Sequence, residues 1–351
     1  MDVVAEAERG LLDFVTIEDG FGLQSDRADR VAGRLDSVLI AARVAPVTQH
    51  IGLVPTVVVT HTEPFHASKA IATLDYVSGG RAGVRVRASP SPAEAALFGR
   101  RVFAAAGRGE LPPSLIAEAA DYVEVIRRLW DSWEDDAEIR DAATGRFIDR
   151  ARLHYIDFAG PYFSVRGPSI TPRPPQGQPV VSALGHGGLP YRLIATAADV
   201  GYVTPRDAGH ARAIVAEIRA AAEGAGRDPQ TVRLFGDLAV FLGGSAVAAA
   251  ARKARLDERA GSTYTSDATV FTGTPERLAD LLAEWHRAGL SGFRLRPGVI
   301  PDDLEAITRA LVPELQRRGL FRTSCPPGTL RARLGLPRPA SRYAAVEGSR
   351  T

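Results

Sequence analysis

The chain is poor in several residue types, and each scarcity narrows its class. Only one of its 351 residues is a cysteine, Cys325. A single cysteine excludes a disulfide within the chain, and we expect a reducing compartment, the cytoplasm. Lysine occurs only at Lys69 and Lys253, so arginine carries nearly all of the positive charge. We interpret this preference for arginine as a GC-rich coding bias rather than as a requirement of function.

An excess of one charge and long apolar runs are also missing. The formal net charge is +2, which favours neither a nucleic acid nor an anionic membrane as a partner. No apolar stretch is long enough to span a bilayer, and the N-terminus lacks the pattern of a signal peptide. His61 and His66 lie five residues apart without a third ligand nearby, so we expect no metal site. With 45% hydrophobic residues, the chain has enough apolar side chains for the core of a globular protein.

Short apolar runs rich in β-branched residues alternate with stretches of helical periodicity. The expected strands lie at 13–17, 51–59, 82–88, 179–184, 200–204, 232–242 and 292–296. The expected helices lie at 35–47, 66–78, 114–133, 189–198, 208–224, 274–289 and 301–318. This order predicts parallel strands joined by right-handed crossovers, as in an α/β (β/α)₈ barrel of the TIM type. Seven strands are one too few, and the helical pattern of residues 1–10 indicates that the first strand is the missing one.

Two segments depart from the alternation. Residues 134–178 are first charged and then rich in glycine, proline and aromatic residues, which predicts a small hairpin on a long loop. The segment 320–351 is rich in proline and has no further strand–helix unit, so we expect an extended arm that wraps the barrel or reaches another subunit. We therefore predict a barrel domain at 1–319 with an insertion at 134–178, an arm at 320–351, and a homo-oligomer.

One turn has the composition of a phosphate-binding loop. The stretch SALGHGGLPYR begins at Ser182 and leads from an expected strand into an expected helix. Gly185, Gly187 and Gly188 permit close backbone approach, and His186 adds a donor. A helix N-terminus exposes N–H groups and the positive end of a dipole, which favour an anion. The alternative is a tight turn with no ligand, and the sequence leaves both interpretations open.

Several longer stretches carry a family resemblance. They read TEPFHASKAIATLD, TLDYVSGG, GRAGVRVRAS, EVIRRLWDSWEDDA, GTPERLADLLAEW and PELQRRGLFRTSCPPGTLRARLGLPRPASRYA. Together they resemble the nitrilotriacetate monooxygenase branch of the bacterial luciferase-like flavin monooxygenases, over nearly the whole chain. The resemblance implies a barrel that binds reduced FMN at the carboxyl ends of its strands. It also implies that a separate NAD(P)H-dependent reductase supplies the flavin, and that one atom of O₂ enters a small organic substrate.

The resemblance also assigns candidate flavin-binding residues, each with a structural alternative. Asp19 matches an acidic residue beside the flavin, or it is a turn or N-cap carboxylate. Thr60 matches a threonine near the flavin ring, or it is an ordinary β-branched strand end. Arg85 is able to fork onto a phosphate, or it is solvated. The turn residues Gly185, His186, Gly187 and Gly188 correspond to the family's phosphate-binding turn.

Elsewhere the chain departs from the family's pattern. Arg85 and Ala88 stand where the family has Asn and Thr, and Gly187 replaces a serine that binds the FMN phosphate. Pro112 and Ile116 replace a histidine and a tyrosine that face the flavin, and neither offers a hydrogen-bonding side chain. The stretch 243–272 is also much shorter than the insertion that family members carry there. No catalytic residue is therefore assigned from the sequence.

These departures leave three hypotheses open. The first is a monooxygenase dependent on reduced FMN (FMNH₂). The second is a degenerate, non-catalytic companion subunit of such an enzyme. The third is a deazaflavin-dependent oxidoreductase.

Overall fold

The computed structural model describes residues 1–25, 27–103 and 111–344. The chain forms two compact units, and each is taken here by itself. Unit 1 comprises Met1–Val15 and Ser182–Pro327, and unit 2 comprises Thr16–Val181 and Gly328–Thr351. The strands β1 (Phe14–Ile17) and β8 (Val180–Gly185) cross two of the three boundaries, and the third lies between Pro327 and Gly328.

Unit 2 is built around two parallel strands, β2 (Gly52–Val58) and β3 (Gly83–Arg87). Every residue of β2 is buried, as expected of a central strand in a parallel sheet. The helices of this unit are α2 (Ser37–Val44), η1 (Ala45–Val47), α3 (Pro64–Val77), α4 (Pro92–Phe98), α5 (Pro113–Asp131), η2 (Arg150–Arg152) and α12 (Leu330–Arg333). Pro64 and Pro113 occupy first helical positions, where the missing N–H has no intrahelical partner to lose.

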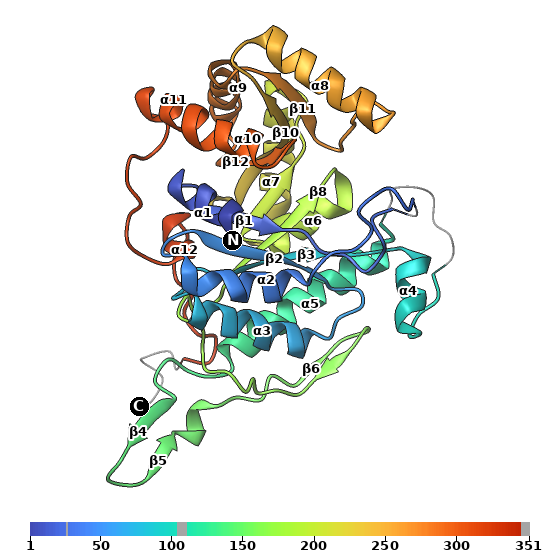
Figure 1. Ribbon diagram of the computed structural model, residues 1–351. Coiled ribbons are helices and arrows are strands. Elements are labelled where there is room, and N and C mark those ends of the chain that lie inside the picture. Colours follow the sequence, from blue (N-terminus) through green and yellow to red (C-terminus); the bar gives the residue numbers. More distant parts are fainter. Residues whose placement is uncertain (26, 104–110, 345–351) are drawn as a thin grey trace. The chain divides into compact units, whose positions relative to one another are not determined.

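The segment 134–178 contains two antiparallel hairpins where the sequence predicted one. The first pairs β4 (Glu138–Asp141) with β5 (Arg146–Ile148), and the second pairs β6 (Phe158–Ala159) with β7 (Ser164–Val165). The β4–β5 hairpin stands away from α2 and α3 (Figure 1). The second hairpin is held by apolar packing, because Phe158 and Val165 pack on a cluster that includes Val125 of α5.

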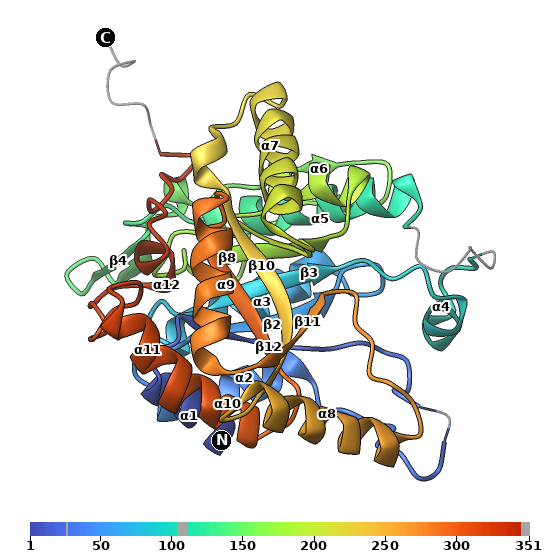
Figure 2. The same ribbon diagram turned by 90° about the horizontal axis from the view of Figure 1, so that it is seen from above.

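The sheet of unit 1 is parallel and centres on β10 (Arg233–Leu242). One edge of β10 pairs first with β9 (Val200–Val203) and then with β11 (Thr269–Gly273), and the other edge pairs with β12 (Gly292–Pro297). On its opposite side β9 pairs with β8. The helices are α1 (Asp2–Arg9), α6 (Gly188–Ala197), α7 (Ala208–Gly224), η3 (Pro229–Thr231), α8 (Ala246–Ala260), α9 (Pro275–Arg287), α10 (Asp302–Ala306), η4 (Ile307–Leu311) and α11 (Val312–Arg317). Figure 2 shows α8 and α9 alongside β10 and β11.

All seven predicted strands and all seven predicted helices are present, with shifts of a few residues at their ends. The sequence analysis did not predict α4, α8, α12 or β11. With β11 the described residues supply eight strands to the main sheet, so the prediction of a missing first strand was wrong, and the strand that was overlooked is β11. The helix α8 buries only Ala249, so it lacks the apolar stripe that marks an amphipathic helix. Its alanines and the Ser245 cap, which accepts from the N–H of Ala248, favour the helix instead.

The predicted arm contacts its own chain where the structure describes it. Arg322 forms an ion pair with Asp13 in unit 1. Beyond Pro327 the segment lies on unit 2, where Arg331 donates to the carbonyl of Gln178. The domain limits 1–319 and 320–351 stay predictions, as does a contact of the arm with another subunit.

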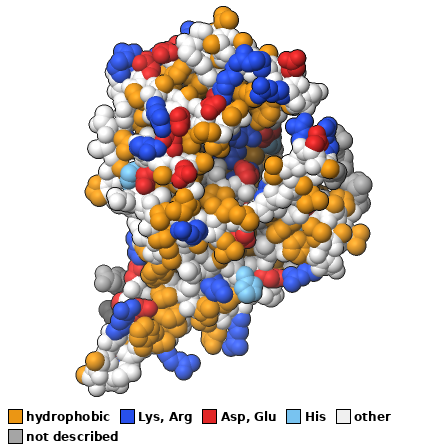
Figure 3. All heavy atoms as spheres, viewed as in Figure 1, with side chains coloured by type: hydrophobic (Ala, Val, Ile, Leu, Met, Phe, Trp, Pro, Cys, Tyr) orange, Lys and Arg blue, Asp and Glu red, His pale blue; other side chains and the backbone are white. Residues whose placement is uncertain are grey.

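Within the described ranges, none of the helices has the length and apolarity needed to cross a membrane. On the face seen in Figure 3, acidic and basic side chains are interspersed among apolar ones.

Candidate functional site

Polar residues follow the strands of unit 2 at their carboxyl ends. Glu18 and Asp19 come directly after β1, and Thr60 and His61 come shortly after β2. Arg85 lies within β3. In a parallel α/β fold the carboxyl ends of the strands are where ligands bind. This edge of unit 2 is therefore the place to compare with the residues that the sequence assigned to the flavin.

Both carboxylate oxygens of Asp19 accept hydrogen bonds from the backbone. Oδ1 accepts from the N–H of Gly20 at 2.7 Å, and Oδ2 accepts from the N–H of Ser37 at 2.9 Å. Ser37 is the first residue of α2, so Asp19 ties the end of β1 to the start of that helix. This is the turn and cap role that the sequence left open as the alternative, and a flavin contact of Asp19 stays a prediction.

Thr60 is buried between two strand ends. Its Oγ1 accepts the backbone N–H of Ser89 at 2.9 Å. This bond joins the end of β2 to the end of β3 and leaves the hydroxyl hydrogen of Thr60 for donation. This free hydrogen fits the predicted role of Thr60 as a donor to a ring oxygen or nitrogen. A flavin contact of Thr60 stays a prediction.

Arg85 is buried, with a side chain that is 7% exposed. Its Nη1 forms an ion pair with the Oε1 of Glu18, whereas its Nε is buried with no hydrogen-bond partner in the described part of the chain. Thr56 of β2 lies opposite Arg85 in the strand register, and its Oγ1 is also buried without a partner. The structure thus excludes the solvated arginine that was the alternative interpretation.

His61 lies in an aromatic cluster that sequence reasoning did not predict. Its ring stacks on Phe98 with centroids 4.9 Å apart, and Phe21 meets it edge-on at 6.1 Å. Its Nε2 is buried without a partner. Burial lowers the pKa of His61; the charges of Glu94 and Glu118 raise it and that of Arg101 lowers it further. The imidazole is therefore neutral near pH 7.

The glycine turn lies in unit 1, between β8 and α6. Gly187 and Gly188 have φ values of 144° and 48°, and a Cβ at either residue meets no atom within 4 Å. No side chain caps the first turn of α6, so its N–H groups keep their anion-binding capacity. Glycine is needed at position 185 for a different reason, because a Cβ there would lie 2.8 Å from the ring of Tyr191.

Both ring nitrogens of His186 face partners within unit 1. Nδ1 lies 3.0 Å from the hydroxyl of Thr204, and Nε2 lies 3.5 Å from a carboxylate oxygen of Asp267. Asp267 in turn accepts from Arg296 at 2.8 Å. Burial raises the pKa of Asp267, but the hydrogen bond and charge of Arg296 outweigh it, and the pKa falls to about 2. Donation from His186 to a phosphate would thus require that the ring leave one of its partners.

The departures from the family pattern lie in apolar or backbone roles. Pro112 is the N-cap residue of α5, and Ile116 is buried on the first turn of that helix. Ala88 directly follows β3. Among the residues that the structure describes, no group of three or more histidine, cysteine or carboxylate side chains is arranged to hold a metal ion.

Comparison with known proteins identifies the family. The model of the family "Luciferase-like monooxygenase" matches residues 1–264. N-acetyl-S-(2-succino)cysteine monooxygenase of Bacillus subtilis (strain 168) is 32% identical over 98% of this chain and 90% of its own length. Nitrilotriacetate monooxygenase component A of Aminobacter aminovorans is 28% identical over 98% and 90%. The solved structure of EDTA monooxygenase from Chelativorans sp. BNC1 matches 96% of this chain and 91% of its own, with 25% identity and a TM-score of 0.83.

The fold is that of the TIM-type barrels of flavin-dependent monooxygenases. The chain belongs to the luciferase-like monooxygenase family, which confirms the family and the fold class predicted from the sequence; the nitrilotriacetate branch is one of several similar groups. The alignment with the Bacillus protein runs over 406 positions, more than the 351 residues of this chain. That relative therefore has internal residues that this chain lacks. Their predicted place at 243–272 stays a prediction.

Proposed function

We propose that this chain is a monooxygenase that binds reduced FMN supplied by a separate NAD(P)H-dependent reductase. It inserts one oxygen atom of O₂ into a small organic substrate. Family membership supports the reaction class, and the open glycine turn before α6 is the observation that carries the cofactor proposal. The relatives are named after three different compounds, so none of them gives the substrate of this chain.

In unit 1 we assign the phosphate to the turn at Gly187 and Gly188. The positive φ of Gly188 and the open space beside both glycines suit a close backbone approach by an anion. The uncapped N–H groups of α6 supply donors where the family's serine hydroxyl is lost. The nearby carboxylate of Asp267 is already paired with Arg296, which limits its repulsion of a phosphate.

The sequence assigned the flavin ring to Asp19 and Thr60, and within unit 2 these residues hold the ends of β1 and β2 in place. Bound FMN supplies the chemistry of oxygen activation, and the protein holds it, orients the substrate and excludes water. With reduced FMN bound at these strand ends, the Thr60 hydroxyl would donate its free hydrogen to a polar atom of the ring. Asp19 positions that strand end through its bonds to Gly20 and Ser37. The sequence also assigned Arg85 to the cofactor, and its role is taken up below.

Anaerobic equilibrium dialysis with reduced FMN tests the proposal. We expect Gly188→Ala to weaken binding by about tenfold, or about 1.4 kcal/mol, because a Cβ in the left-handed region distorts the turn. Gly261→Ala is the matched control, since Gly261 caps α8 with a φ of 73° and also has open space. Equal losses in both variants would contradict a phosphate site at the turn.

A companion subunit without catalysis is the second candidate. The apolar Pro112, Ala88 and Ile116 at positions where the family is polar favour it. If the unmodified chain binds no reduced FMN at tens of micromolar, this candidate replaces the first. A parallel titration with a deazaflavin cofactor tests the third hypothesis in the same experiment.

A further inference from the structure

We propose that Arg85 and Thr56 form a binding site for a carboxylate group of the substrate, so that the substrate is an organic acid. That the bound acid is a substrate rests on the proposed function. The binding site itself is argued from unit 2 alone. It moves Arg85 from the cofactor, where the sequence placed it, to the second ligand of the reaction.

Arg85 differs from Arg81 and Arg173, two other buried arginines of its unit, in how little it is paired. Arg81 donates five hydrogen bonds through Nε, Nη1 and Nη2, all to neutral oxygens. Arg173 donates through the same three nitrogens to Asp131, Asp135 and a carbonyl. Among the residues that the structure describes, Arg85 has one ion pair, with Glu18, and its Nε is buried without a hydrogen-bond partner. A buried guanidinium with unused donors is costly, and a further acceptor removes that cost.

A second unpaired group lies next to it. Thr56 and Arg85 are Cα partners in the parallel pair of β2 and β3, so their side chains leave the same face of the sheet. The hydroxyl of Thr56 is buried and without a partner, like the Nε of Arg85. A guanidinium edge and a hydroxyl on adjacent strands offer donors to the two oxygens of one carboxylate.

The charge of the surroundings favours a monoanion over a phosphate. Glu18 already brings one negative charge to the guanidinium, and its side chain is half exposed. A carboxylate adds a second charge of the same size, whereas a phosphate adds up to two and meets stronger repulsion from Glu18. Arg87, two residues further on the same face of β3, is held by the carbonyl of Asp19 and lies 3.9 Å from Glu94. It supports a positive potential there without being buried.

The test compares succinate with its neutral analogue succinamide, by calorimetry on the full chain. We expect succinate to bind the unmodified protein at least about tenfold more tightly, about 1.4 kcal/mol. In Arg85→Met this preference disappears, and in Thr56→Val it falls by several-fold. In Arg87→Met, the matched control on the same face, the preference remains within about threefold because Arg87 is not assigned to the carboxylate.

Three results would overturn the inference. They are equal binding of the two probes by the unmodified chain, an equal loss in the Arg85 and Arg87 variants, and a loss of FMN binding in Arg85→Met with the succinate preference intact. The last of these returns Arg85 to the cofactor. A failure of the proposed function looks different, since the chain would then bind no reduced FMN while still preferring succinate. Thermal unfolding of each variant checks that it is folded.

Discussion

The buried polar side chains of unit 2 differ in how many of their donors and acceptors have hydrogen-bond partners. The free energy of unfolding of variants should reveal this difference. Arg85 is buried with one ion pair among the described residues, whereas Arg81 donates five hydrogen bonds. The proposed carboxylate site would account for an under-paired arginine in a core, because binding sites retain groups that cost stability.

Replacing Arg85 by methionine should therefore stabilise the free protein. We expect the free energy of unfolding to rise by about 1 kcal/mol, because an apolar side chain removes the unpaired Nε and the half-exposed Glu18 remains solvated. Arg81→Met, the control, should lower it by about 3 kcal/mol or more, since it leaves buried carbonyls without donors. Urea unfolding measures both. A loss of stability in Arg85→Met would show that the residue is structural.

Asp75 predicts a pH dependence of stability. Burial raises its pKa to about 6, against hydrogen bonds from Gln176 and Ala82 that lower it. The folded state therefore holds a proton that the unfolded state has lost between about pH 4 and pH 6. The contribution of Asp75 to stability falls as pH rises through this window, by about 3 kcal/mol in total, and is constant above it.

The measurement is urea unfolding at pH 4, 5, 6 and 7, for the unmodified protein and for Asp75→Asn. The difference between the two curves isolates Asp75 from the other titrating groups. We expect that difference to change across the window and to be flat above pH 6. Parallel curves from pH 4 to pH 7 would contradict a raised pKa.

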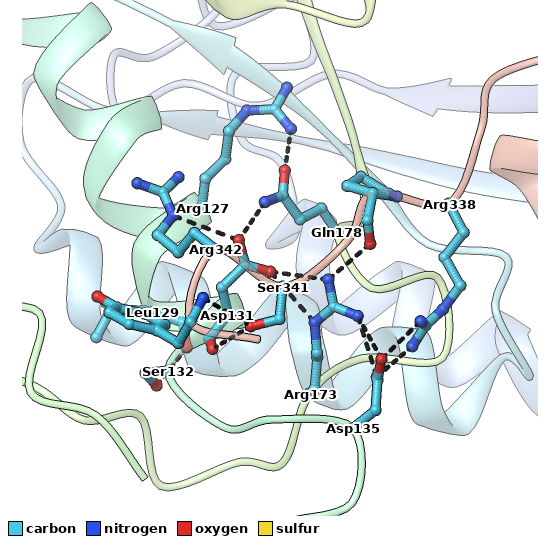
Figure 4. A network of polar contacts seen from close by, with 12 residues as sticks. Arg127, Leu129, Asp131, Ser132, Asp135, Arg173, Gln178, Arg338, Ser341 and Arg342 are labelled. Atoms are coloured by element: carbon cyan, nitrogen blue, oxygen red, sulfur yellow. Dashed lines mark hydrogen bonds and ion pairs between the residues drawn. The ribbon is translucent and has the colours of Figure 1, made fainter. Parts of the chain in front are cut away.

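At the scale of elements, the C-terminal segment of unit 2 is held by a network of charged groups. Figure 4 shows Arg173 between Asp131 and Asp135, with Arg338 and Arg342 of the segment on the same carboxylates. Asp131 and Arg173 are each 1% exposed, whereas Arg338 and Asp135 are about half exposed. The hydrogen bonds of Arg338 and Arg173 lower the pKa of Asp135 to about 2, although burial opposes them.

Burial should decide how much each arginine of the C-terminal segment contributes to the free energy of unfolding. Arg331 of α12 is buried, and it donates through Nε to the carbonyl of Gln178 and through its backbone N–H to Gln176. We expect Arg331→Ala to lower the free energy of unfolding by about 2 kcal/mol, because it removes a buried charged donor. Arg338→Ala should cost about 0.5 kcal/mol, as is usual for an exposed ion pair. Similar losses in both variants would contradict this assignment.

For the whole molecule, the homo-oligomer stays a prediction, and unit 2 adds a reason for it. Large apolar side chains are exposed at Leu35, Leu39, Leu97 and Val102. A second copy of the chain that covers these side chains would remove their apolar surface from water. We expect light scattering after size exclusion to give a multiple of the chain mass, and Leu35→Glu with Leu39→Glu to lower it. A monomeric mass for the unmodified chain would contradict the prediction.

The sequence predicted the order of strands and helices because their hydrophobic periodicity is local. It also placed Gly187 and Gly188 in a turn before a helix, since glycine and proline mark such turns wherever they occur. It missed α8, whose exposed surface carries no apolar stripe. Neighbouring residues along the chain are sufficient to predict strands, amphipathic helices and glycine turns, but not a helix without an apolar stripe.

The sequence by itself determined the family, the barrel class and the candidate positions. Only the tertiary structure decided which polar atoms are already used. Both carboxylate oxygens of Asp19 accept from backbone N–H groups, and the ring nitrogens of His186 contact Thr204 and Asp267. Arg85 and Thr56 meet with unused donors because strand register brings them together. Hydrogen bonds between distant segments depend on that register and on packing, which no local pattern encodes.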